Sequence, residues 1–234
     1  PEEADEWFET WKERRKAFYD TIGIDPDNLR FHEHGPDELA HYARAAFDVE
    51  YKFPIGWSEL EGIHNRSDFD LRQHAEHSGK NMSYMDPQTN QRYTPFIIET
   101  SAGCDRTTLA VLCEAYEEET LEDGSVRTVM HFHPSLAPIK VAILPLVKKG
   151  GLRELATELK DELKRNFNVF YDEKGAIGRR YRRMDEAGTP FCVTVDFDSL
   201  EDKAVTVRDR DTMEQVRVPM SELNAWLGAR ILIR

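Results

Sequence analysis

Two acidic side chains, Glu59 and Glu61, stand two positions apart in the densest polar stretch of the chain, residues 56–70. On a β-strand such residues share one face, and two like charges on one face cost energy unless a cation lies between them. A metal ion, an ammonium group or the guanidinium of Arg66 would supply that cation. A solvated sheet face explains the same spacing.

A second polar group follows at residues 99–106. Glu99 and Ser101 share a strand face, and Gly103 permits a tight turn into a helix whose first turn holds Arg106. A cation there opposes the helix dipole, whereas an anion bound by Arg106 and the helix N-terminus would offset this cost. Phosphate is the predicted anion, and a surface pair between Arg106 and Asp105 is the alternative.

The strongest basic patch of the chain lies at residues 174–183. It could bind RNA phosphate, or it could form a solvated helix face paired with Asp185 and Glu186. Farther on, Arg208 and Arg210 share a strand face and could read RNA bases, unless they pair with the neighbouring aspartates. The candidate RNA-binding residues are therefore Arg179, Arg180, Arg182, Arg183, Arg208 and Arg210.

Histidine pairs raise the question of zinc. The pairs His32/His34 and His131/His133 have no cysteine at ligand spacing beside them, and no H-E-x-x-H motif occurs. We therefore expect no structural zinc. No glycine-rich phosphate loop and no G-x-S-x-G motif occurs either, which removes two common nucleotide-binding and hydrolase signatures.

The first part of the chain is expected to form an antiparallel sheet with helices. Apolar residues recur at helical spacing at Trp7, Trp11, Phe18 and Ile22 and predict a helix over 3–21. Helices are also predicted over 39–46 and, after the turn at Gly103, over 107–119. Alternation predicts strands over 49–53, 55–63 and 94–99. Strands separated by irregular segments, with few βαβ units, favour an α+β arrangement with an antiparallel sheet.

The second part predicts a small α/β domain, because strand and helix patterns alternate along it. Ser221 is the expected N-cap of the last helix. The predicted strands cover 140–147, 169–171 and 191–197 with a hairpin of 204–208 and 215–219, and the predicted helices cover 152–167, 178–185 and 221–227.

Charge divides the chain in two. Residues 1–134 hold 13 Lys and Arg against 28 Asp and Glu, whereas residues 135–234 hold 18 against 16. We predict domains over 1–134 and 135–234, joined within 117–137, where Glu122-Asp123-Gly124 reads as a turn. The overall net charge of −13 argues against DNA or membrane surfaces as partners, and no run of apolar residues is long enough to span a bilayer. Three scattered cysteines indicate a reducing compartment, the cytoplasm.

These motifs closely resemble, in order, the glycyl-tRNA synthetases of the homodimeric class II type. The segments that carry the resemblance are Ala40–Ala43, Gly56–Ile63, Arg66–Leu71, Glu99–Arg106, Lys140–Leu146, Gly188–Phe191 and Thr206–Arg210. The family joins glycine to its tRNA with ATP through a glycyl-adenylate. The resemblance implies part of a class II catalytic domain over 1–134 and an anticodon-binding domain over 135–234.

The resemblance also implies roles. Gly103 and Arg106 match the third class II signature, whose arginine contacts the ATP γ-phosphate. Glu99 and Ser101 match positions that recognise the ammonium group of glycine. Glu59, with Leu60 beside it, matches a carboxylate next to ATP and its Mg²⁺, and Arg66 matches an arginine near the substrates.

The chain departs from the family at its amino-terminal end. The first two class II signatures, which build the dimer interface and grip the α-phosphate, do not occur, and the chain does not begin with methionine. We therefore expect a carboxy-terminal half that is inactive alone and belongs to a homodimeric enzyme. The alternative is a non-catalytic relative that binds nucleic acid or a polymerase, although such proteins typically lose the active-site residues that are present here.

Overall fold

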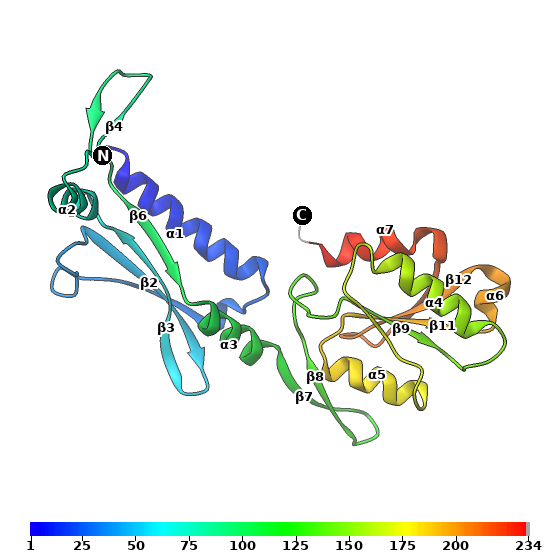
Figure 1. Cartoon of the computed structure of the whole chain (residues 1–234). Helices are drawn as coiled ribbons and strands as arrows, with labels where there is room; N and C mark the ends of the chain where they lie inside the picture. The colour runs from blue at the N-terminus through cyan, green and yellow to red at the C-terminus, as the bar shows by residue number, and fades with distance from the viewer. Residues whose placement is uncertain (233–234) are drawn as a thin grey trace. The chain divides into compact units, whose positions relative to one another are not determined.

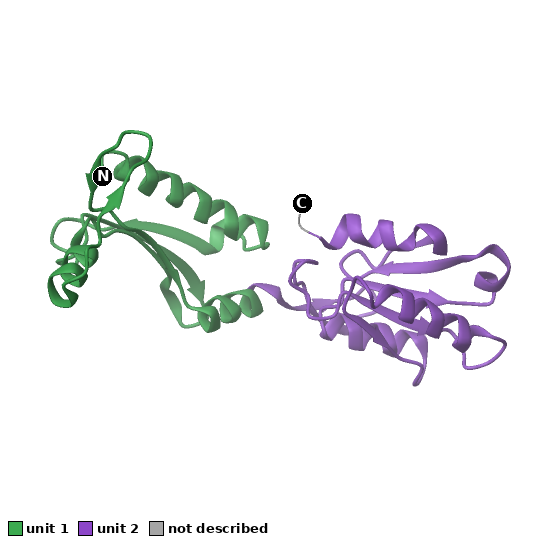
Figure 2. Cartoon of the chain, turned by 45° about the horizontal axis from the view of Figure 1, so that its top comes forward, with its two compact units in different colours: residues 1–113 green, residues 114–234 purple. Residues whose placement is uncertain are grey.

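The computed structural model describes residues 1–232, and the chain divides into two compact units, residues 1–113 and residues 114–234 (Figure 2). The sequence placed the boundary at 134/135 instead. The two boundaries differ by the segment 114–134, which belongs to the second unit and contains a hairpin with strands at 116–120 and 126–130. No helix in the described range is long and apolar enough to cross a membrane.

Unit 1 is built on an antiparallel sheet with the strand order β1-β2-β3-β6 and with helix α1 packed against it (Figure 1). Phe8, Tyr19 and Ile22 pack with Phe47 and Ile63 in the core between helix and sheet. The elements are α1 (Ala4–Thr21), η1 (Pro26–Asn28), β1 (Leu29–Glu33), β2 (Ala45–Phe53), β3 (Gly56–Asn65), α2 (Phe69–Ser78), β4 (Tyr84–Met85), β5 (Arg92–Tyr93), β6 (Ile98–Ala102) and α3 (Cys104–Ala115).

The predicted first helix is confirmed as α1, but its buried face is rotated by one residue. Phe8 is buried, whereas Trp7, which the apolar spacing placed on the stripe, is 46% exposed. The strands predicted over 49–53 and 55–63 are present as β2 and β3, although β2 begins earlier, at Ala45, and β3 continues to Asn65. The strand expected over 94–99 lies later, at β6, because its ladder with β3 runs from Ile98 opposite Asn65 to Ala102 opposite Glu61.

The helix predicted over 39–46 is wrong. Residues 39–44 form turns and bends, and β2 begins at Ala45. The cause is tertiary pairing, because Ala45 and Ala46 lie opposite Asn65 and His64 in the ladder with β3. Long-range strand pairing here overrides the local helix preference of alanine.

Unit 2 carries a mixed sheet with the strand order β10-β9-β11-β12-β13, in which β10, β9 and β11 run parallel. Helices α4 and α7 cover one face and α5 covers the other (Figure 1). The elements are β7 (Tyr116–Thr120), β8 (Val126–Met130), β9 (Val141–Pro145), α4 (Leu152–Leu163), β10 (Val169–Tyr171), α5 (Ile177–Glu186), β11 (Phe191–Val195), α6 (Asp198–Asp202), β12 (Ala204–Asp209), β13 (Gln215–Pro219) and α7 (Met220–Ile231).

The predicted strand and helix pattern of this unit is confirmed, with small changes at the ends. Ser221 is not the N-cap of α7, since the helix starts at Met220 and its cap residue, Pro219, offers no side-chain bond. The burial of both sheet faces explains the continuous apolar run of β9, which is fully buried along its length.

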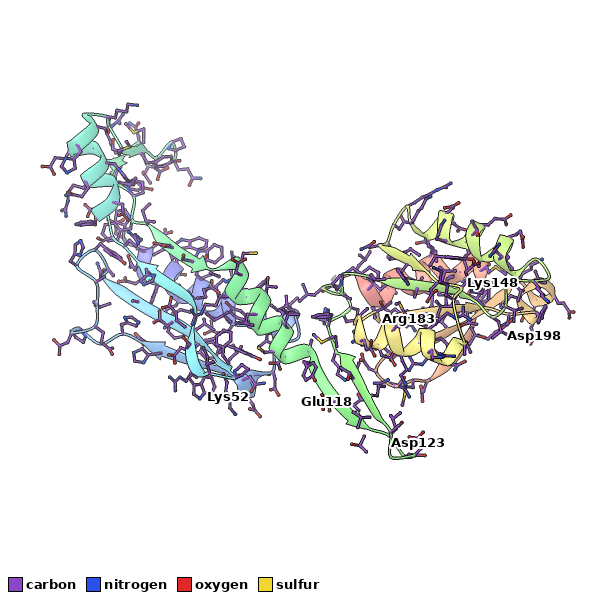
Figure 3. The ribbon with its side chains drawn as sticks, turned by 60° about the horizontal axis from the view of Figure 1, so that its bottom comes forward. Lys52, Glu118, Asp123, Lys148, Arg183 and Asp198 are labelled. Atoms are coloured by element: carbon purple, nitrogen blue, oxygen red, sulfur yellow. The ribbon has the colours of Figure 1, made fainter. Side chains whose placement is uncertain are left out.

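The hairpin β7–β8 replaces the end of the helix predicted over 107–119 and part of the predicted linker. Helix α3 ends at Ala115, and Tyr116–Thr120 pairs with Val126–Met130. Arg127 and Val129 alternate onto a buried face, which is the signal of a strand. The turn around Glu122-Asp123-Gly124 is confirmed, with Gly124 at φ 79° and Asp123 at the tip (Figure 3).

Candidate active site

Arg66 is the centre of the first candidate site. Its guanidinium donates to both oxygens of Asp70, from Nε to Oδ2 at 2.6 Å and from Nη2 to Oδ1 at 3.0 Å. Its third nitrogen, Nη1, donates to Oε2 of Glu99 at 2.6 Å, and its carbon Cζ lies 4.1 Å from the ring centre of Tyr42. One arginine thus joins the end of β3, helix α2 and strand β6.

The backbone next to Arg66 is built to hold this position. The amide of Arg66 donates to Ile97 O at 2.9 Å, and the amide of Ile97 donates to Ser67 O at 2.9 Å. Ser67 takes a left-handed conformation with φ 50°, and its amide donates to the side chain of Asn65 at 3.1 Å. The chain therefore leaves β3 in a fixed turn that points Arg66 toward β6.

The electrostatics of the cluster follow from these bonds. The hydrogen bond to Asp70, followed by the one to Glu99, raises the pKa of Arg66 above its usual range. The same bond lowers the pKa of Asp70, so both groups are charged at neutral pH. Arg66 is 21% and Glu99 34% exposed, which leaves the carboxylate of Glu99 accessible to a ligand.

Glu99 and Ser101 share one face of the sheet with Gly62 and His64, as the predicted alternation requires. In the ladder His64 lies opposite Glu99 and Gly62 lies opposite Ser101. A Cβ at Gly62 would come within 2.6 Å of Cε1 of His64, so the imidazole folds back over the glycine. His64 Nδ1 is buried and has no hydrogen-bond partner within residues 1–232. The face therefore offers an acid and a hydroxyl, with little room directly over Gly62.

Arg106 extends from the first turn of α3, as predicted, and Nη2 donates to Oγ of Ser58 on β3. Its guanidinium carbon lies 5.4 Å from the ring centre of Phe53. Within residues 1–232 it forms no ion pair with Asp105, so the surface-pair alternative is not what the structure contains. Gly103 is exposed directly before the helix, where an anion can approach.

The expectation that Glu59 and Glu61 share a face is wrong. Between Val49 and Glu50 the ladder of β2 and β3 shifts by one residue, so Leu60 is an extra residue in β3. Leu60 and Glu61 are both buried, while Glu59 is exposed and lies opposite Glu50. A bulge leaves no sign in a pattern of residue types, which is why alternation failed here.

Glu61 faces the core, where its carboxylate bonds to side chains of α1 and takes no part in the candidate site. Its Oε1 accepts from Arg15 Nε at 2.6 Å and its Oε2 accepts from the Tyr19 hydroxyl at 2.6 Å. Burial and the bond to Glu61 raise the pKa of Tyr19. Glu61 is 1% exposed and is neutralised by Arg15, so no metal is needed between the two glutamates.

In unit 2, three of the six arginines proposed to bind RNA are interior residues. Arg180 is 1% exposed and donates to Pro145 O at 2.8 Å. Arg208 is 5% exposed and binds both oxygens of Asp185, at 2.8 and 3.1 Å. Arg210 is 2% exposed and donates to Gly188 O and to its neighbour Asp211. Pairing with a neighbouring aspartate, the alternative considered from the sequence, therefore describes Arg210, whereas Arg208 pairs with Asp185, which is distant in the sequence.

The other three arginines lie nearer the surface of α5. Arg182 is 41% exposed and lies 3.5 Å from Asp185. Arg183 is 45% exposed and pairs with Asp172 (labelled in Figure 3). Arg179 is exposed and has no ion-pair partner in the part of the chain that the structure describes. The predicted helix face thus presents Arg179, Arg182 and Arg183 to solvent.

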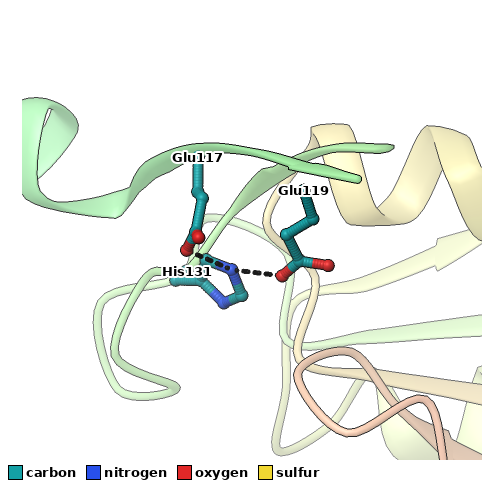
Figure 4. Close-up of side chains that lie close together, drawn as sticks. All are labelled: Glu117, Glu119 and His131. Carbon is teal, nitrogen blue, oxygen red and sulfur yellow. Dashed lines mark hydrogen bonds and ion pairs between the residues drawn. The ribbon is translucent and has the colours of Figure 1, made fainter. Parts of the chain in front are cut away.

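A cluster that the sequence did not single out lies on the β7–β8 hairpin (Figure 4). Ligand-type atoms of Glu117, Glu119 and His131 lie within 4.8 Å of one another. His131 Nε2 lies 2.9 Å from Glu119 and Nδ1 lies 2.6 Å from Asp211, while Arg127 also pairs with Glu119 at 2.7 Å. Because Arg127 already neutralises Glu119, these contacts explain the cluster as an internal charge network.

The architecture defines the class of protein. Residues 140–230 match the family model described as anticodon binding domain. Over 97% of this chain and 47% of the other, the fold resembles that of the prolyl-tRNA synthetase from Cryptosporidium parvum in complex with L-proline and AMP, with a TM-score of 0.67 and 16% identity. The chain thus has a class II aminoacyl-tRNA synthetase fold with an anticodon-binding domain.

Relatives at higher identity narrow this class. Glycine–tRNA ligase of Treponema denticola is 57% identical over 236 residues, which cover 99% of this chain and 52% of the relative. The ligase of Bacillus cereus is 58% identical over 231 residues, and that of Clostridium acetobutylicum is 54% identical over 226 residues. The chain is a homologue of glycine–tRNA ligase and spans about half the length of the curated relatives it matches.

Proposed function

We propose that this chain is part of a glycine–tRNA ligase, which activates glycine with ATP and transfers it to tRNA. The single observation that carries the proposal is the Arg66–Glu99 pair on an open sheet face beside Ser101 and Gly62. It is an accessible carboxylate, fixed in place, on a surface with little room for a side chain. Glycine differs from other amino acids by having no side chain, so this face suits it.

Glu99 is the proposed partner of the glycine ammonium group. Its Oε2 is taken by Arg66, and Oε1 is left to accept from the substrate. Ser101 and Gly62, opposite each other in the ladder, would lie against the α-carbon, with the folded-back ring of His64 as a wall. Contacts with Ser101 and Gly62, together with the His64 ring, would discriminate against an amino acid with a methyl side chain by crowding that methyl group.

Arg66 is proposed as a positioning residue. It contacts Asp70 with two nitrogens and Glu99 with one, and stacking on Tyr42 restricts its plane. Catalysis of adenylate formation depends on in-line attack by the glycine carboxylate on the α-phosphate of ATP, hence on orientation and charge neutralisation. Arg66 holds the Glu99 carboxylate in place while that attack takes place.

Arg106 is the proposed contact of the ATP γ-phosphate, next to the start of α3 and Gly103. The bond to Ser58 directs its guanidinium toward β3 and away from the helix, where phosphate oxygens can reach it. Glu59 directly follows Ser58 in the same strand, is exposed, and lies opposite Glu50, which pairs with Arg30. The carboxylate of Glu59 could hold a Mg²⁺ that accompanies ATP. Leu60 would contribute only its backbone to ATP binding, because its side chain is in the core.

For unit 2 we propose binding of the tRNA(Gly) anticodon. The match to an anticodon binding domain supports this assignment, together with the exposed Arg179, Arg182 and Arg183 on α5. Partners of the whole enzyme would be tRNA(Gly), glycine, ATP and a second copy of the subunit, in the cytoplasm, where tRNA is charged. Retention of Glu59, Glu99, Ser101 and Arg106 favours this enzyme over a non-catalytic accessory subunit.

The test is glycine-dependent exchange of pyrophosphate into ATP, measured on the full-length gene product with Glu99→Gln. We expect kcat/KM for glycine to fall about 10- to 100-fold, because a hydrogen bond between charged groups is lost, while the KM for ATP stays unchanged. Glu76→Gln, which neutralises an exposed carboxylate of α2, is the matched control. Unchanged glycine kinetics in Glu99→Gln would contradict the assigned site.

The chain by itself provides a second test. We expect it to show no pyrophosphate exchange, since the residues that grip the α-phosphate in the family are not among its motifs. Exchange by the purified chain alone would show that its own residues complete the ATP site.

A further inference from the structure

The imidazole of His131 lies between acidic groups from two parts of unit 2. On one side, Nε2 lies 2.9 Å from Oε1 of Glu119 and 3.4 Å from Oε2 of Glu117, both on β7 (Figure 4). On the other side, Nδ1 lies 2.6 Å from Oδ1 of Asp211, in the turn between β12 and β13. Each nitrogen of the ring therefore points at a carboxylate.

The carboxylates on the two sides of the ring are ionised. Against the effect of burial, the hydrogen bond from Arg127 lowers the pKa of Glu119. Likewise against burial, the two bonds from Arg210 lower the pKa of Asp211. An ionised carboxylate only accepts hydrogen bonds, and a neutral imidazole has one N–H whereas the imidazolium ion has two. Both contacts can therefore be hydrogen bonds only when His131 carries two ring protons.

The balance of charge around the ring favours the same state. The charged groups that contact the ring or its carboxylate partners are Glu117, Glu119, Arg127, Arg210 and Asp211. Asp185 of α5 lies beyond Arg127 and pairs with Arg208, and the next histidine, His133, bonds to Ser135 instead. Within the described residues, three carboxylates thus face two arginines, and a positive charge on His131 completes the balance.

Two side chains link the hairpin β7–β8 to the turn between β12 and β13. Arg127 is buried, donates to Arg210 O at 2.9 Å, and keeps its charge at all relevant pH values. His131 is 25% exposed, so protons of the solvent reach it. When the ring loses one proton, one nitrogen presents a lone pair to a carboxylate, and the link from β7 to Asp211 is broken at one end. The hairpin is then loosened, while Arg127 still holds it.

We infer that His131 is a pH-sensitive latch that fastens the hairpin β7–β8 to the turn between β12 and β13. The latch is complete when the imidazole carries both protons. It is lost as the pH rises through the range in which histidines change charge, between about pH 5 and pH 8. Since β7 directly follows α3, the latch acts on the segment with which the chain enters unit 2.

The experiment is amide hydrogen exchange of the chain as it exists, between about pH 5 and pH 8. Each rate is expressed as protection relative to an unstructured peptide at the same pH. For the amides of residues 116–130 we expect protection to fall about 10-fold across this range, because a hydrogen bond between charged groups is lost. His131→Lys keeps a cation throughout, so its protection should stay high. His131→Gln is always neutral, so its protection should be low throughout.

The protonation of the ring is measured directly by the ¹⁵N chemical shifts of its two nitrogens. At the acidic end of the range both nitrogens of His131 should carry a proton, and the loss of one should coincide with the loss of hairpin protection. His77→Gln removes an exposed histidine of α2 in unit 1 and is the matched control. It should keep the wild-type profile of the hairpin.

Three results would overturn the latch. The first is protection of the wild-type hairpin that does not change with pH. The second is a pH dependence that persists in His131→Lys, because it would belong to another group such as His133. The third is equal protection in His131→Lys and His131→Gln, because the charge would then not fasten the hairpin. Should His131→Gln fail to fold by circular dichroism, the wild-type and His131→Lys profiles still decide.

Discussion

Each unit contains an arginine whose guanidinium donates two hydrogen bonds to the carboxylate of an aspartate. The two pairs differ in burial. In unit 1, Arg66 and Asp70 are 21% and 27% exposed and Arg66 also holds Glu99. In unit 2, Arg208 and Asp185 are 5% and 0% exposed. In the interior of unit 2, Asp185 also lies 3.5 Å from Arg127, which is itself fully buried.

The comparison shows that the same pair of residue types can serve two purposes. A half-open pair contributes little to stability, because water competes for both charges, and it can hold a neighbouring ligand group in position. A buried pair cannot lose one partner without stranding a charge in the interior. We therefore assign Arg66–Asp70 to the candidate site and Arg208–Asp185 to the framework of unit 2.

Replacement of the two aspartates should give the largest difference in stability between the two pairs. Asp185→Ala strands Arg208, whose two carboxylate bonds both go to Asp185, and should cost about 3–5 kcal/mol of unfolding free energy, whereas Asp70→Ala should cost about 1 kcal/mol or less. Denaturant unfolding, with hydrogen exchange to locate the loss, measures both. Asp198→Ala, an exposed aspartate of α6, is the control. Equal losses from Asp185→Ala and Asp70→Ala would contradict the division into framework and site.

The two glutamates of β3 allow a second comparison of a buried and an exposed side chain, this time within unit 1. Glu61→Gln weakens the buried bonds to Arg15 and Tyr19 and should cost about 2 kcal/mol, whereas Glu59→Gln, exposed on the same strand, should cost under about 0.5 kcal/mol. Chemical denaturation of the two variants measures the difference. If both lose the same stability, the bulge at Leu60 does not separate the two side chains.

The smallest expected effect on stability is the pH dependence that arises from His34. The hydrogen bond to Asp48, at 2.8 Å, raises the pKa of His34 in the folded chain despite the opposing effect of burial. A raised folded pKa adds stability that is fully present below about pH 6.5, the ordinary value for histidine, and is lost as the pH rises through the folded pKa.

We therefore expect unit 1 to lose under about 1 kcal/mol between mildly acidic and mildly alkaline pH, a range around the ordinary histidine value. Unfolding of wild type and His34→Gln across this range measures the effect, with hydrogen exchange to separate the units. A pH dependence that is the same in the variant would place its origin elsewhere.

Much of the fold could be predicted from local patterns. The alternation in β2, the apolar run of β9 and the amphipathic spacing of α4 each specify an element, because burial on one or both faces imposes a period on the sequence. The candidate site residues Glu99, Ser101 and Arg106 likewise follow from the pattern of a strand face, a glycine turn and a helix.

The failures have one physical origin, which is contact between residues far apart in sequence. The bulge at Leu60, the start of β2 at Ala45 and the strand β7 after Ala115 are all set by partners across a ladder. The burial of Arg180 and Arg208 likewise depends on Pro145 O and on Asp185. A run of arginines specifies charge and not depth, so it could not reveal which members reach solvent.

The central claim is that the Arg66–Glu99 face receives glycine as its adenylate. The most direct measurement is calorimetric binding of a stable glycyl-adenylate analogue to the full-length gene product, wild type and Glu99→Gln, beside AMP alone. We predict that Glu99→Gln binds the analogue about 10- to 100-fold more weakly and binds AMP as wild type does. Equal affinity of both proteins for the glycyl analogue would contradict the account.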